Sequence, residues 1–203
     1  MNTLPPSHAS VTRSVTIRRL VRVATLACLV AAVPGLAAQG PPTSSVAIDV
    51  AEVQKVLSTI TAPQGDQQIR VVDMGRYNLA VGVLHRGKTT DTPGAPITGL
   101  VHSQITETYV ILSGEGTLVT GGSLQNPRAF PADNEVVTTL AGPSTAGPIQ
   151  NGSMRRVKTG DVIIIPAGVP HGWTNVPDHV DYLSIRPDQD KVLPAGYVHP
   201  TIR

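Results

Sequence analysis

Hydrophobic positions follow two different spacings along the chain, and the spacing changes near residue 65. Between residues 49 and 61 apolar side chains recur every three or four positions, which predicts one amphipathic helix. These side chains are Val50, Val53, Val56, Leu57 and Ile60. Asp49 and Glu52 stand three residues apart at the start of this run, as in a capping box. We expect this helix to pack on the outside of the main fold.

After residue 65 apolar and polar positions alternate in short runs, which predicts β-strands. The predicted strands cover residues 68–73, 78–85, 99–105, 107–112, 116–120, 135–140, 161–165, 172–175 and 180–185. Turns rich in Gly, Pro, Asn and Asp separate them. Short strands at this density, without a sequence repeat, favour an all-β barrel or jelly roll. Residues 121–156 are polar and rich in Pro and Gly, and we predict a long loop there that contains the 135–140 strand.

The first 38 residues have a different pattern. An apolar run of 11 residues covers 23–33, and four Arg with no acidic residue come before it. Pro34 and Gly35 end the run, and Ala37 and Ala38 follow. This order is typical of a secretory signal peptide, and the run is shorter than the roughly 20 residues that a membrane span needs. We expect cleavage after Ala37 or Ala38, and export to the periplasm or the outside of the cell.

Removal of that segment changes the composition of the chain. The mature protein would comprise a leader and packing helix over residues 39–66 and a barrel domain over 67–203. The full chain has 16 Lys and Arg against 14 Asp and Glu, and loss of four Arg leaves 12 against 14, a net charge of −2. We therefore expect no nucleic-acid partner, and no membrane partner after cleavage. The single Cys, Cys28, also leaves, which excludes a disulfide or a catalytic thiol.

The strongest local pattern runs from Gly160 to Asn175. Five residues separate Gly160 from Pro166-Ala-Gly168, two more lead to His171, and three more lead to Asn175. An apolar strand would enter a tight turn, in which Gly168 can adopt a positive φ angle. The chain would then return as a second strand with His171 on its inner face. A His held on a rigid strand is a suitable metal ligand.

A related pattern lies upstream and contains Gly94, Leu100, His102, Glu107 and Gly114. Together the two patterns resemble the two sequence motifs of the cupin superfamily, in its small single-domain (type-2) form. The second motif has all five of its defining positions. The first motif departs from the family at Leu100, where cupins have their first His.

Two registers of the first motif remain open. In one, Leu100 occupies the place of the first His and His102 that of the second. In the other, His102 is the first, Gln104 is the second, and the loop to Glu107 is one residue shorter. Because side chains two apart share a strand face, His102 points inward in both registers, and Gln104 does so if the strand runs straight.

The resemblance implies a metal site made of His102, Glu107 and His171, with Gln104 as a fourth ligand in the second register. Two imidazoles and a carboxylate suit one divalent transition metal, namely Fe, Mn, Ni or Zn. Tyr109 shares a strand face with Glu107, and we expect these two residues to act in catalysis; a tyrosine of the core is the alternative for Tyr109. We expect Arg186 to be an ordinary surface arginine.

The resemblance covers about residues 71–186 and implies a small β-barrel that binds a small molecule, in many members as a homodimer. Cupins include dioxygenases, isomerases, lyases, storage proteins and binding proteins, so the fold does not name the reaction. The favoured hypothesis is an exported metalloenzyme that acts on a small oxygen-bearing substrate. A non-catalytic binding or sensor module is the alternative, because Leu100 replaces a ligand. A structural or storage barrel would have lost its pocket altogether.

Overall fold

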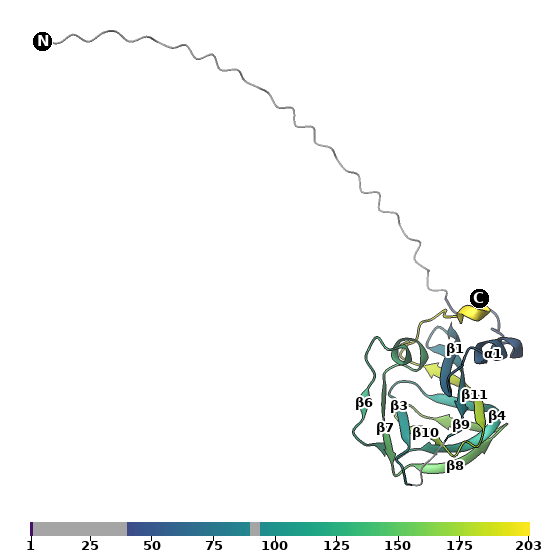
Figure 1. Ribbon diagram of the computed structural model, residues 1–203. Helices are drawn as coiled ribbons and strands as arrows, with labels where there is room; N and C mark the ends of the chain where they lie inside the picture. Colours follow the sequence, from purple (N-terminus) through teal and green to yellow (C-terminus); the bar gives the residue numbers. More distant parts are fainter. Residues whose placement is uncertain (2–39, 90–93) are drawn as a thin grey trace. The chain divides into compact units, whose positions relative to one another are not determined.

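The computed structural model describes residues 40–89 and 94–203, together with Met1. The predicted signal peptide over residues 1–38 therefore lies outside the described residues, apart from Met1. Within the described ranges, no helix has the length and apolar character that a membrane crossing requires. Strands dominate the described chain and form one curled antiparallel sheet (Figure 1). The predicted all-β barrel with one N-terminal helix is confirmed.

Eleven strands make up this sheet in the described part of the chain. They are β1 (Gln64–Asp73), β2 (Asn78–Gly87), β3 (Thr98–His102), β4 (Glu107–Thr120), β5 (Ser123–Leu124), β6 (Arg128–Ala129), β7 (Ser144–Gln150), β8 (Ser153–Lys158), β9 (Val162–Ile165), β10 (His171–Thr174) and β11 (His179–Asp188). The hydrogen-bonded order is β1-β2-β11-β4-β10-β3-β7-β5. In addition, β6 pairs with β7, and β8 and β9 pair with β4.

Strand β4 belongs to both halves of the barrel. Its first part pairs with β11 and β9, and its second part pairs with β10 and β8. Ile111 pairs with Tyr182 and Ser113 with Asp181, so Leu112 is an extra residue that forms a bulge. A bulge bends its strand, which explains why two predicted strands, at 107–112 and 116–120, are one bent strand.

Residues 121–156 differ from the predicted long loop. They contain β5, β6, β7 and the start of β8, while a π-helical turn, η1 (Val136–Leu140), replaces the strand predicted at 135–140. Asn134 starts this turn, because its side-chain oxygen accepts a hydrogen bond from the Val136 backbone N at 2.9 Å. The backbone of β7 pairs with β3, a partner distant in sequence. Because backbone hydrogen bonds hold this strand, its polar sequence lacks the apolar alternation from which a strand is predicted.

The predicted helix is present as α1 (Val50–Leu57). It begins after Asp49, whose backbone N donates to Glu52 Oε2 at 3.3 Å. Val53 and Val56 pack against Ile69 of β1, and Figure 1 shows α1 lying beside that strand. A separate buried cluster forms inside the barrel. It consists of Leu84, Tyr109, Ile111, Leu118, Val157, Ile165, Val176, Val180 and Tyr182.

Candidate metal centre

The ends of three strands carry the side chains that the two motifs predicted to be ligands. His102 ends β3, Glu107 begins β4 and His171 begins β10. Gly168 lies in the turn between β9 and β10 with a φ angle of 81°, as predicted. Its backbone N donates to the carbonyl oxygen of His102 at 2.8 Å. The turn of the second motif is therefore bonded directly to the first motif.

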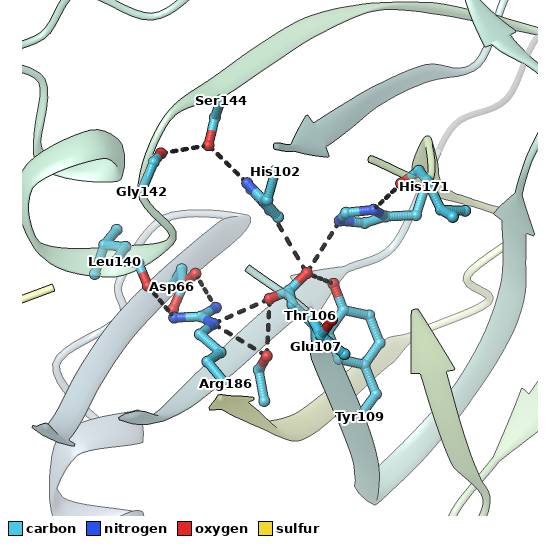
Figure 2. A network of polar contacts seen from close by, with 12 residues as sticks. Asp66, His102, Thr106, Glu107, Tyr109, Leu140, Gly142, Ser144, His171 and Arg186 are labelled. Carbon is cyan, nitrogen blue, oxygen red and sulfur yellow. Dashed lines mark hydrogen bonds and ion pairs between the residues drawn. The ribbon is translucent and has the colours of Figure 1, made fainter. Parts of the chain in front are cut away.

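The three predicted ligands converge on one point, where both imidazoles aim at the carboxylate (Figure 2). His171 Nε2 lies 3.1 Å from Glu107 Oε2, and His102 Nε2 lies 3.5 Å from the same oxygen. The ligand atoms of the three residues all lie within 4.8 Å of one another. All three residues are buried, with at most 5% of their surface exposed.

Hydrogen bonds on the far side of each ring assign its tautomer. Ser144 Oγ donates to the Gly142 carbonyl at 2.7 Å, so it can only accept at His102 Nδ1, which lies 2.7 Å away. His171 Nδ1 lies 3.0 Å from the Val169 carbonyl, which has no proton to give. In its neutral form, each ring therefore carries its proton on Nδ1, on the basis of this network. Each Nε2 lone pair then faces Glu107.

The environment keeps the imidazole of His102 neutral and Glu107 ionised. Burial lowers the pKa of His102 to about 4, although the charge of Glu107 opposes this shift. For Glu107, burial acts to raise the pKa, but the charge of Arg186 holds it well below its usual range. Two imidazole nitrogens and one carboxylate oxygen thus meet at one buried point. A divalent transition-metal ion fits this donor set.

The remaining lone pairs of Glu107 are held by three other side chains. Glu107 Oε1 accepts hydrogen bonds from Ser184 Oγ at 2.8 Å and from Arg186 Nε at 3.0 Å. Glu107 Oε2, the oxygen that faces the histidines, accepts one from Tyr109 OH at 3.0 Å. These contacts fix the carboxylate in one orientation, as outer partners do at metal sites.

The prediction that Arg186 is a surface arginine is wrong. Its side chain is fully buried, and it also donates to Asp66 Oδ2 at 2.5 Å, to Gln68 Oε1 at 3.0 Å and to the Leu140 carbonyl at 2.9 Å. The alternation of residues along β11 could have predicted this burial, because every second residue of that strand is buried. This inner face includes Val180, Tyr182, Ser184 and Arg186.

The condition under which Gln104 would point inward beside His102, a strand that runs straight past His102, is not met. Strand β3 ends at His102, and Gln104 lies exposed in the bend that follows, so the two-residue alternation does not extend to it. Leu100 pairs with His171 across the sheet and lines the cavity, which corresponds to the first of the two registers. Tyr109 lines the cavity too, and it is also part of the barrel core.

A cavity of about 620 Å³ opens at the three ligands. Its polar walls include Asp66, Arg86 and Lys88, and its apolar walls include Leu84, Leu100, Phe130, Leu140 and Trp173. This volume falls within the usual range for small-molecule sites, which are mostly apolar with a few polar groups. The storage-barrel hypothesis predicted loss of the pocket, and the described structure contains one.

Comparisons with known proteins give structural neighbours only. No protein-family model matches the chain, and no curated protein matches it. A double-stranded β-helix protein from Klebsiella pneumoniae is 21% identical, covers 72% of this chain and 93% of its own, and has a TM-score of 0.40. The DMSP lyase DddQ from Ruegeria pomeroyi is 16% identical with a TM-score of 0.40, and the match covers 70% of this chain but only 54% of the lyase.

A third neighbour is an oxalate oxidase, 14% identical, with 79% of this chain and 72% of its own covered and a TM-score of 0.44. All three scores lie below 0.5, so the assignment of the fold depends on the strand order and the two motifs of this chain. Together these define the class of protein, an all-β barrel with a buried His-Glu-His group that could bind a metal.

Proposed function

We propose that this chain is an exported metalloprotein of the cupin type, in which His102, Glu107 and His171 hold one divalent metal ion (Fe, Mn, Ni or Zn). The observation that carries this proposal is the convergence of two imidazole Nε2 atoms on one buried carboxylate oxygen. An arrangement of three acceptors is stable only with a cation or a shared proton among them. Ser144 and the Val169 carbonyl hold the imidazoles in the tautomers that ligation requires.

We further propose that the protein is an enzyme for a small oxygen-bearing substrate, of the dioxygenase, isomerase or lyase type. A bound ion would supply Lewis acidity toward a substrate oxygen. The cavity would admit the substrate to the face of the ligands, and its apolar walls would exclude water. Tyr109 OH is bonded to the ligand oxygen of Glu107 and lines the same cavity, so it can hold a proton beside a bound substrate.

The second candidate is a binding or sensor module without catalysis, and Leu100 favours it. In the register that the strands adopt, an apolar side chain occupies the place of a ligand. Both candidates need the cavity and the metal, but only an enzyme would turn over a substrate. Oxygen uptake and product formation, screened over diketones, phenolics and organic acids, would separate the two.

Metal analysis of the purified protein tests the proposed centre. We expect about one equivalent of metal per chain in the wild type and a large loss in His171→Ala. The matched control is His85→Ala, which changes a half-buried histidine of β2 that pairs with Asp181 instead. Equal trace metal in all three proteins, with thermal unfolding intact, would overturn the metal centre.

Export, the small-molecule partner and assembly as a homodimer are parts of the same proposal. Residues 1–38 support export through their charged start, apolar run and small residues. The mass of the protein recovered from outside the cytoplasm should correspond to a chain that starts at Ala38 or Gln39. Light scattering of that material would give the oligomeric state, and a full-length mass inside the cell would contradict export.

A further inference from the structure

Arg86 is a cavity residue that neither motif includes. It lies near the end of β2, two residues after Leu84, and both side chains line the cavity. Arg86 Nε donates to the hydroxyl of Tyr182 at 3.3 Å. Trp173 Nε1 donates to the same hydroxyl at 3.1 Å. This shared contact anchors the guanidinium group in the wall of the cavity.

No carboxylate of residues 40–89 and 94–203 forms an ion pair with Arg86, and Asp66 acts on it only through its charge at longer range. Asp66 and Glu107, the acidic residues among the described residues of the lining, are both ion-paired with Arg186. The one side-chain hydrogen bond of Arg86 in these ranges goes to a neutral phenol. A partly buried cation beside apolar walls loses hydrogen bonds to water. An anion that binds there replaces them with charge-assisted hydrogen bonds of its own.

The balance of charge around the cavity favours an anionic ligand. Among the described residues of the lining, Arg86 and the exposed Lys88 equal Asp66 and Glu107 in number, and the buried Arg186 that pairs with both acids adds one further positive charge. A divalent ion on the three ligands would make the site more positive. Charges in a cavity with low-dielectric walls interact more strongly than charges in water.

We propose that Arg86 binds the carboxylate of a small organic anion with an apolar or aromatic body. A guanidinium group matches a carboxylate with two parallel hydrogen bonds, which a neutral analogue cannot reproduce. The body of the ligand would contact Leu84, Leu100, Phe130 and Trp173. This inference rests on the proposed function for the second end of the ligand, which would reach the metal centre.

Calorimetric titration of the zinc-loaded mature protein with benzoate tests the proposal, with benzamide as the neutral analogue. We expect benzoate to bind and benzamide to bind at least about tenfold more weakly, because the neutral amide cannot form the charge-assisted pair of hydrogen bonds with Arg86. Arg86→Gln should weaken benzoate by a similar factor and leave benzamide unchanged. The control Lys88→Gln removes an exposed cation of the same cavity and should weaken benzoate less than about threefold.

Two further variants test the proposal even if Arg86→Gln does not fold. Arg86→Lys keeps the charge but loses the two-pronged geometry, so its benzoate affinity should lie between those of the wild type and Arg86→Gln. Tyr182→Phe keeps Arg86 and removes its anchor, and it should weaken benzoate less than Arg86→Gln does. The proposal is overturned if benzamide binds as tightly as benzoate, or if folded Arg86 variants bind benzoate like the wild type.

The same titration distinguishes this inference from the metal proposal. Benzoate binding that depends on Arg86 in a protein that takes up none of Fe, Mn, Ni and Zn would support the anion site and contradict the metal centre. One equivalent of zinc without any benzoate binding would support the metal centre and overturn the anion site.

Discussion

Arg186 and Glu107 are bonded side by side inside the barrel, with the guanidinium Nε 3.0 Å from the carboxylate Oε1. Because Arg186 and Ser184 occupy Oε1, the other oxygen of Glu107 is turned toward the two histidines. Figure 2 shows this division, with the arginine on one side of the carboxylate and the imidazoles on the other. A single buried arginine thus orients the anionic ligand of the candidate centre.

Replacing Arg186 should therefore destabilise the fold. Arg186→Met leaves Asp66 and Glu107 buried without their shared cation, and breaking a buried pair in this way typically costs about 3–5 kcal/mol. Urea unfolding measures the loss. The control is Arg156→Met, because Arg156 pairs with Glu115 at 2.6 Å with 65% and 40% of the two side chains exposed. That exposed pair should contribute no more than about 1 kcal/mol, so equal losses in the two variants would contradict the role of Arg186.

Ser144 should affect metal affinity more than stability. Ser144→Ala removes the acceptor that keeps the proton of His102 on Nδ1, and loss of such an outer partner typically weakens metal binding about 10–100-fold. Competition for zinc against a chelator of known affinity measures this change. Ser103→Ala is the control, since Ser103 is exposed and, among the described residues, its hydroxyl donates to the Pro143 carbonyl alone. Wild-type zinc affinity in Ser144→Ala would contradict the tautomer assignment.

Gly114 should tolerate no side chain. Its φ angle is 72°, and a Cβ atom would lie 2.0 Å from the carbonyl oxygen of His179. Gly160 has a φ angle of 92° but open space around the same position, so it isolates the effect of the backbone angle. We expect Gly160→Ala to lose about 1–2 kcal/mol of unfolding free energy and Gly114→Ala about 2–5 kcal/mol. Equal losses, measured by urea unfolding, would show that the contact with His179 has no energetic effect.

The free energy of unfolding of the metal-free protein should decrease as the pH is lowered, because of His102. Burial lowers its folded pKa from 6.5 to about 4, so between these values the unfolded chain binds a proton that the folded chain does not. The contribution of His102 is therefore destabilising as the pH falls from 6.5 towards 4, by up to about 1.4 kcal/mol per pH unit. Urea unfolding in chelator across this range, compared with His102→Gln, measures it. The same slope in both proteins would contradict the shift.

The sequence predicted the parts of the candidate site that depend on local geometry. His171 follows a Pro-Gly turn, and Glu107 keeps its spacing to Gly114, so strand and turn rules sufficed to bring both side chains inward. The inward placement of Gln104 depended on a straight strand, and β3 ends at His102, so the alternation of side chains does not reach it. No local pattern marked that end, since β3 stops where its pairing with β7 stops.

Residues that support the ligands were missed because they come from distant segments. Ser144 begins a strand inside the region predicted to be a loop, and it reaches His102 across 42 positions of sequence. Arg186 lies 79 positions from Glu107, and only the alternation along β11 could have placed it inside the barrel. The sequence predicted no role for Arg86, because a lone arginine in a strand ordinarily lies at the surface.

The bond from the Gly168 N–H to the His102 carbonyl has a kinetic consequence. It joins the strands of the two motifs through the backbone alone, so their separation is set when the barrel folds and needs no ion. The ligands are then preorganised, and an arriving ion meets a geometry that already exists. Zinc should accordingly associate with the folded protein in a single fast phase, and hydrogen exchange in β3 and β10 should be nearly the same before and after loading.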